Sequence, residues 1–267
     1  MSKGLDIIVC IKQVPDPEAP PSAFSFDSQN LSISSSGVPP VISPFDENAL
    51  ELALRLKEKT GGSITPLSAG KGISRAVMVK ASAAGADDAL LIDDPALERT
   101  RVDGFATAMI LAAAIRRRGP FDLILTGRQA SDTNAGLVGI GIAHFLDIPC
   151  ITLAGDARIA EGEVTVERVP ASGHEVVKAA MPALLTVSHE VGNLRYPSLV
   201  SMRVSKNKPV TVMTLADLAI DPEAACRLTM QGLEVPVRER SVVMIDGKDS
   251  RAAGIKLALL LREDSIL

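Results

Sequence analysis

Short apolar runs alternate with longer amphipathic segments along the first half of the chain. The runs are rich in Val, Ile and Leu, as is typical of buried parallel strands, and they cover residues 6–14, 63–69, 89–92 and 121–126. Segments of helical length follow them at residues 46–60, 73–85, 101–118 and 134–146. Strands that alternate with helices predict βαβ units with right-handed connections. The expected fold is α/β, an open, mostly parallel twisted sheet with helices on both faces.

Individual side chains predict where some of these elements begin and end. Asp46 is the expected N-cap of the first helix and Gly61 marks its end, while Thr133 or Asn134 is expected to cap the fourth helix. The buried stripe of the first helix is expected to comprise Leu50, Leu54 and Leu56. A weak alternation at residues 24–33 predicts a small hairpin on the surface.

The pattern changes after Pro149. Strand-like segments at residues 150–157, 163–170 and 175–187 predict an antiparallel meander that joins the main sheet through its last five residues. Further helices are expected at residues 200–208, 215–220 and 251–262, the last capped by Asp249 or Ser250, with an extended arm at residues 222–243. We therefore expect an α/β nucleotide-binding domain over residues 1–200 and a C-terminal arm over residues 201–267. An arm of this kind is hard to stabilise alone and predicts a partner chain.

Composition narrows the class of protein. With 46% hydrophobic and 22% charged residues, the 267-residue chain can bury a large core, and no apolar run is long enough for a membrane span. A formal charge of −4 and only 3% aromatic residues argue against nucleic acid as the main partner. The three cysteines are widely spaced, which predicts reduced thiols, no zinc site and a cytoplasmic setting without a signal peptide.

A polar loop follows the expected strand at residues 121–126. Gly127 permits a sharp turn, and the next residues crowd donors and acceptors ahead of a helix: Arg128, Gln129, Ser131, Asp132, Thr133 and Asn134. A helix N-terminus offers unpaired N–H groups to an anion, and Arg128 adds donors suited to phosphate. The loop therefore predicts a nucleotide-phosphate site. The alternative is an ordinary βα connection, which needs one glycine and one cap but no such cluster. Neither a Walker A pattern nor a G-x-G-x-x-G pattern is present.

These residues carry a resemblance to a known family. GRQASD at residues 127–132, followed by Val138-Gly139, resembles the β subunit of electron transfer flavoprotein. IVCIKQVPD at residues 8–16, a Pro-Phe turn before the first helix and RYPSL at residues 195–199 extend the resemblance over nearly the whole chain. The sequence departs from the family pattern after Asp132, where fewer polar side chains would face a phosphate.

The resemblance implies an adenine-nucleotide-binding fold whose loop holds the phosphate end of AMP in the ordinary type, or of a second FAD in the electron-bifurcating type. The redox FAD would lie at the interface with the α subunit and be held mostly by that chain. The residues implied in nucleotide binding are Cys10, Ser43, Pro44, Phe45, Asp46, Ala69, Gly127, Arg128, Gln129, Ala130, Ser131, Asp132, Thr133, Asn134, Gly136, Val138 and Gly139. Without the resemblance, plain core packing is the favoured interpretation of Cys10, and Phe45 with Asp46 could be a hydrophobic staple and cap.

The resemblance also implies partners. The chain would form a heterodimer with an α subunit, around which the C-terminal arm wraps. A loop that includes Val191, Arg195 and Tyr196 would dock dehydrogenases such as acyl-CoA dehydrogenases, with Val191 near the position of the usual apolar anchor.

No set of residues predicts catalysis by the chain's own side chains. Its three histidines are scattered, no metal-ligand spacing occurs, and no Ser-His-Asp or Cys-His arrangement can be assembled. The chain is therefore expected to be an electron-carrier subunit whose redox chemistry belongs to FAD. Two alternatives stay open: a bifurcating-type subunit with a second FAD that oxidises NADH, and a stand-alone nucleotide-binding regulator of universal-stress type.

Overall fold

A computed structural model describes residues 4–98, 102–221, 225–236 and 242–267 of the chain. The chain forms two compact units, Met1–Leu233 and Glu234–Leu267, which are described separately.

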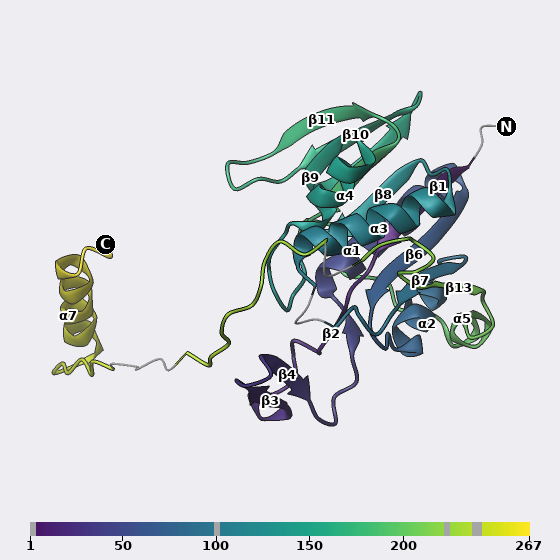
Figure 1. Ribbon diagram of the computed structural model, residues 1–267. Helices are drawn as coiled ribbons and strands as arrows, with labels where there is room; N and C mark the ends of the chain where they lie inside the picture. Colours follow the sequence, from purple (N-terminus) through teal and green to yellow (C-terminus); the bar gives the residue numbers. More distant parts are fainter. Residues whose placement is uncertain (1–3, 99–101, 222–224, 237–241) are drawn as a thin grey trace. The chain divides into compact units, whose positions relative to one another are not determined.

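The first unit is built on one large sheet whose strands lie in the order β11-β10-β9-β12-β8-β1-β6-β7-β13 (Figure 1). The strands are β1 (Leu5–Cys10), β6 (Gly62–Gly70), β7 (Ala89–Asp93), β8 (Leu123–Gly127), β9 (Cys150–Ala160), β10 (Glu163–Arg168), β11 (Glu175–Ala180), β12 (Ala183–Val187) and β13 (Val210–Met213). Neighbours pair in parallel except at β9–β10 and β10–β11. The predicted α/β fold with its antiparallel meander is confirmed.

Helices cover both faces of this sheet. They are α1 (Pro44–Thr60), α2 (Arg75–Ala84), α3 (Gly104–Arg118), α4 (Val138–Leu146) and the short α5 (Leu199–Ser205). Successive side chains of a strand point to opposite faces, so Ile7 packs with α1 and α2 while Ile8 packs with α3 and α4. The expected stripe on α1, Leu50, Leu54 and Leu56, is buried. Two apolar layers therefore enclose the parallel strands and hold their carboxyl ends in fixed positions.

The first expected strand proves to be two. β1 ends at Cys10, and β2 (Gln13–Val14) leaves the sheet to pair with β5 (Val41–Ile42). The chain departs because the Lys12 N–H donates to the carboxylate of Asp46, at 2.8 Å, instead of to a strand. The predicted hairpin is confirmed as β3 (Phe24–Asp27) and β4 (Ser32–Ser35), preceded by the 3₁₀ turn η1 (Pro21–Ala23).

Two predicted helix caps are wrong. The N-cap of α1 is Ser43, not Asp46, and it makes no side-chain cap bond. Helix α4 begins only at Val138, with Leu137 as a cap residue that offers no side-chain acceptor. Asn134 instead closes a turn, with φ of 52° and its N–H donating to the Ala130 carbonyl at 2.8 Å. The Asn134 side chain accepts from the Gln129 amide at 2.9 Å within this turn, so it does not cap the helix.

The region after the meander also differs from expectation. Residues 210–213 form the edge strand β13, which was not predicted and which pairs with β7. The helix expected at residues 215–220 is a series of turns, because Thr214 and Asp217 bond to each other and the Leu215 N–H donates to Asp94 at 3.1 Å. The helix expected at residues 200–208 is the shorter α5.

The second unit contains α7 (Ser250–Glu263). Its N-cap is Asp249, whose carboxylate accepts from the Ala252 N–H at 2.8 Å, as one of the two expected caps. None of its residues is buried within the unit, and Ile255 and Leu259 are exposed. Of the expected arm at residues 222–243, residues 222–224 and 237–241 lie outside the described residues. Among the helices that are described, none is long and apolar enough to cross a bilayer.

Candidate functional site

The predicted loop begins at the carboxyl end of β8, beside the ends of β1 and β12. In parallel sheets this is the edge where ligands bind, because loops and helix N-termini converge there. The Arg128 N–H donates to the Val187 carbonyl at 2.9 Å, so the loop leaves the sheet against β12. On the other side, the Ser43 N–H donates to the Lys12 carbonyl at 2.9 Å. Residues 10–12, 43–46 and 127–139, which are distant in sequence, are thus brought together.

Asp46 joins three of these segments. One carboxylate oxygen accepts from the Lys12 N–H at 2.8 Å and the other from the Gly127 N–H at 3.0 Å. The residue is only 7% exposed, and this burial raises the pKa of Asp46 to about 7, although the two N–H groups act in the opposite direction. Asp46 therefore fixes the relative positions of the β1 exit, the start of α1 and the β8 exit, and contributes to the site by holding its walls.

Close packing explains the glycines at the two ends of the loop. A Cβ on Gly127 would lie 2.5 Å from Oδ1 of Asp46 and 2.7 Å from the carbonyl carbon of Phe45. A Cβ on Gly139 would lie 2.5 Å from Oγ1 of Thr126. Both separations are too short for real contacts, so glycine lets α1 and α4 approach the end of β8.

Two buried polar atoms in the loop have no hydrogen-bond partner within the described chain. They are Nε of Arg128 and Oγ of Ser131. The Arg128 guanidinium lies over the Phe45 ring at 5.0 Å, and the Ser131 N–H donates to Oγ of Ser43 at 3.3 Å, so both residues are held in place. Buried polar groups are normally paired, because an unpaired one costs about 1–3 kcal/mol. A phosphate would supply acceptors here, beside the uncapped N-terminus of α4.

Two further contacts involve polar side chains of the loop. Nζ of Lys12 pairs with Asp132 at 2.9 Å, and the Gln129 amide donates to Asn134 at 2.9 Å. The ion pair offsets the negative charge that Asp132 would otherwise present to a phosphate. This contact could not be read from the sequence, because Lys12 and Asp132 are 120 residues apart.

At the ends of β1 and β6, the site is lined by small and largely apolar side chains. Cys10 is buried, and burial raises the pKa of its thiol, so the residue is a neutral lining group. Ala69 lies near the end of β6, one residue after Ser68, whose buried Oγ has no hydrogen-bond partner among the described residues. Sequence reasoning missed Ser68. Its only signal was a serine at the carboxyl end of an apolar run.

The other implied nucleotide residues lie in the same loop. Gly136 has φ of 64°, the left-handed region that favours glycine, and Val138 and Gly139 form the first turn of α4. Ala130 accepts in the turn, while Thr133 is exposed. The structure therefore brings together the implied phosphate-binding residues, with Ser43, Pro44, Phe45 and Asp46 as the opposite wall.

The implied docking residues differ from one another in exposure. Val191, in the 3₁₀ turn η2 (His189–Val191), is 4% exposed and packs in the core. Arg195 is bound by two carboxylates of α1, those of Glu51 at 3.0 Å and Glu58. Tyr196 is fully exposed.

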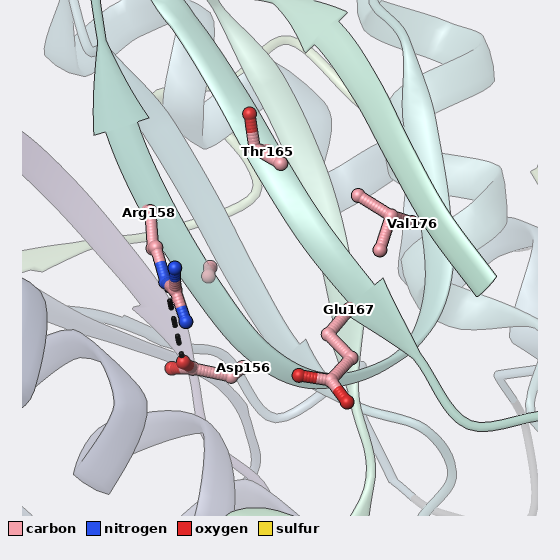
Figure 2. Close-up of a pocket in the computed structure, with 6 residues that line it drawn as sticks. Asp156, Arg158, Thr165, Glu167 and Val176 are labelled. Carbon is pink, nitrogen blue, oxygen red and sulfur yellow. Dashed lines mark ion pairs between the residues drawn. The ribbon is translucent and has the colours of Figure 1, made fainter. Parts of the chain in front are cut away.

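A shallow pocket lies elsewhere, on the face of β9, β10 and β11. Figure 2 shows its lining, which includes Thr165, Glu167, Val176 and the ion pair of Asp156 with Arg158 at 3.9 Å. None of the sequence-predicted site residues lines it. Nor do the described residues include a group of three or more His, Cys, Asp or Glu side chains placed to hold a metal ion.

Comparison with known proteins identifies the family of the chain. The model of the electron transfer flavoprotein domain matches residues 30–218. The chain belongs to this family. Its match includes α1 and the whole of the β8–α4 loop, and leaves out β1 and α7.

Curated relatives place the chain among the β subunits of electron transfer flavoproteins, as its motifs predicted. It is 37% identical over 218 residues to electron transfer flavoprotein subunit beta of Thermoanaerobacterium thermosaccharolyticum, covering 81% of each chain. It is 32% identical over 267 residues to caffeyl-CoA reductase-Etf complex subunit CarD of Acetobacterium woodii, covering 98% of this chain and 99% of that one. To protein FixA of Azotobacter vinelandii it is 36% identical over 198 residues, covering 72% of this chain and 68% of that one.

Proposed function

We propose that the chain is the β subunit of a heterodimeric electron transfer flavoprotein that carries electrons between flavin dehydrogenases and a downstream acceptor, with AMP or FAD bound in its β8–α4 loop. One observation carries the nucleotide site: Nε of Arg128 and Oγ of Ser131 are buried beside the uncapped N-terminus of α4 and have no hydrogen-bond partner among the described residues. A phosphate fits this set of donors, because it accepts from guanidinium, hydroxyl and backbone N–H groups together.

The residues divide into two roles around such a nucleotide. Arg128 and Ser131 would bind the phosphates, with backbone N–H groups at Val138 and Gly139. The buried surface of Cys10 and the end of β6 at Ala69 would contact the adenosine. Redox chemistry would be supplied by FAD, held mostly by the α subunit. The chain itself would bind and orient the nucleotide and dock the partner proteins.

Partner binding is the second half of the proposal. The segment over residues 201–267, with its exposed α7, would wrap the α subunit, and the loop through Val191, Arg195 and Tyr196 would dock dehydrogenases such as acyl-CoA dehydrogenases. Of these three side chains, Tyr196 is the one presented fully to a partner, while Arg195 is held by Glu51. The complex is expected in the cytoplasm.

A bifurcating-type subunit, with a second FAD in the loop that oxidises NADH, is the second candidate. It is favoured by the similarity to CarD, which is named as a subunit of a reductase-Etf complex and matches over nearly its whole length. The two candidates differ in the nucleotide that the loop holds.

Analysis of the bound nucleotides tests both candidates. The chain would be co-expressed with its α partner, purified and denatured, and the released nucleotides identified by chromatography and absorbance. One FAD and one AMP per heterodimer would support the ordinary carrier, whereas two FAD and no AMP would support the bifurcating type. A stable homodimer without flavin, or failure to form a heterodimer, would refute the proposal in favour of a stand-alone nucleotide-binding regulator.

A further inference from the structure

Asp103 bonds to two parts of the chain that are far apart in sequence. One carboxylate oxygen accepts from the Ala106 N–H at 2.8 Å and thereby caps α3. The other accepts from the N–H groups of Arg227 and Leu228, at 2.6 and 2.7 Å. Burial alone would raise the pKa of Asp103, but these N–H donors outweigh it and hold the pKa below its usual value. The carboxylate is therefore ionised at neutral pH, and its bonds to the backbone are charge-assisted.

Two further contacts hold the same stretch of chain on the first unit. The Arg227 guanidinium lies over the Phe105 ring, 5.2 Å from its centroid, and Ala225 is only 4% exposed. Phe105 in turn packs edge-on against Phe145 of α4, with ring centroids 5.1 Å apart. Residues 225–228 are thus bound by a carboxylate, by an aromatic ring and by burial.

This contact lies at the same edge of the sheet as the nucleotide loop. Helix α3 follows β7, so its N-terminus lies at the carboxyl end of a parallel strand, where the β8–α4 loop also lies. Gly104 packs against Leu137, the residue before α4; a Cβ on Gly104 would lie 3.7 Å from that of Leu137. The loop, the start of α3 and residues 225–228 therefore adjoin.

The chain leaves the first unit soon after this point. The first unit ends at Leu233. In the part of the chain that the structure describes, we find no hydrogen bond between residues 229–233 and the rest of this unit. Arg227 and Leu228 are thus the last residues described as hydrogen-bonded to it.

We propose that Asp103 anchors the last part of the C-terminal arm, residues 229–267. It would fix the start of this segment at the ligand edge of the sheet, so that a partner held by the segment is tethered beside the nucleotide loop. The part about the partner rests on the proposed function, whereas the anchor itself is a property of this chain alone. Asp103 is a positioning residue, with no role in chemistry.

The anchor sets the length of the tether. Residues 229–248 connect it to Asp249, the cap of α7, and fully extended they span at most about 70 Å. Without the Asp103 carboxylate, the N–H groups of Arg227 and Leu228 lose their acceptor, while the burial of Ala225 and the contact of Arg227 with Phe105 remain. The start of the tether is then held less firmly.

Hydrogen exchange on the full chain tests the anchor with Asp103→Ser. Serine is a good N-cap, so α3 keeps its bond at Ala106, but its hydroxyl is too short to reach Arg227 and Leu228 as well. Backbone exchange at Arg227 and Leu228 is expected to accelerate at least about tenfold, because their two charge-assisted bonds are lost, while exchange in α3 stays unchanged. Asp249→Ser is the matched control, because that cap bonds only to its own helix among the described contacts.

Two results would overturn the anchor. One is unchanged exchange at Arg227 and Leu228 in Asp103→Ser. The other is acceleration there that occurs only together with α3, which would show a helix cap and nothing more. If Asp103→Ser fails to fold, Leu228→Pro removes one of the two donors without altering α3 or the Arg227 side chain, and the same comparison applies. The measurement needs neither nucleotide nor α subunit, so its failure is distinguishable from failure of the proposed function.

Discussion

Replacing Asp46 by alanine should destabilise the chain more than its place in the first turn of a helix suggests. The side chain does not cap α1. It accepts from the Lys12 N–H at 2.8 Å and from the Gly127 N–H at 3.0 Å, and so links two strand exits that are 115 residues apart in sequence. Alanine fits the helix and removes both acceptors at once.

The expected loss follows from the two donors. An N–H group left without a partner in a buried setting costs about 1–3 kcal/mol, and both donors here are part-buried, so we expect a combined loss of about 2–5 kcal/mol in the free energy of unfolding. Asp46→Asn keeps one acceptor oxygen and should lose about half as much. A loss of this size is a large part of the stability of an ordinary domain.

Urea denaturation at pH 6, followed by far-ultraviolet circular dichroism, measures the loss, since the chain has no Trp and one Tyr for fluorescence. The control is Asp27→Ala, whose carboxylate also accepts backbone N–H groups, from Gln29 and Asn30, but in an exposed turn. We expect a clearly smaller loss there. Equal losses in the two variants, or a loss at Asp46 below about 1 kcal/mol, would refute the reasoning, because they would show that water replaces the buried acceptor.

Three further predictions concern the same site. Arg128→Ala should weaken retention of the bound nucleotide by about 1–3 kcal/mol, which equilibrium dialysis would detect as a rise of roughly 5- to 150-fold in Kd; unchanged retention would remove Arg128 from the site. The raised pKa of Asp46, about 7, means that its contribution to stability is fully present below about pH 4 and is lost as pH rises through 7. The stability advantage of the wild type over Asp46→Asn should therefore shrink between pH 5 and pH 8, and a growing advantage would contradict this sign. Gly139→Ala should lower the free energy of unfolding by about 1–3 kcal/mol, since its Cβ would lie 2.5 Å from Thr126, whereas Gly254→Ala, in open space on α7, should not; thermal unfolding compares the two.

The order of the elements could be predicted because it depends on local periodicity. The spacing of apolar residues in a segment decides whether a strand or a helix can bury them on one face. The structure contains α1, α3 and β8 in the segments where this spacing predicted them. The phosphate loop was also visible, because Gly127 and Arg128 follow a buried strand and precede a helix. Element ends were less predictable: α4 begins four residues after Asn134, since the loop's side chains serve a turn.

What the sequence by itself determined was thus the α/β order, the polar loop and, through its motifs, the family. Tertiary structure alone decided which carboxylate meets which backbone: Asp46 with Lys12 and Gly127, and Asp103 with Arg227 and Leu228. It also decided that Nε of Arg128 is buried without a hydrogen-bond partner in the described part of the chain. The physical reason is that such contacts depend on how distant segments pack, and a carboxylate carries no local signal of the donor it will meet across a hundred residues of chain.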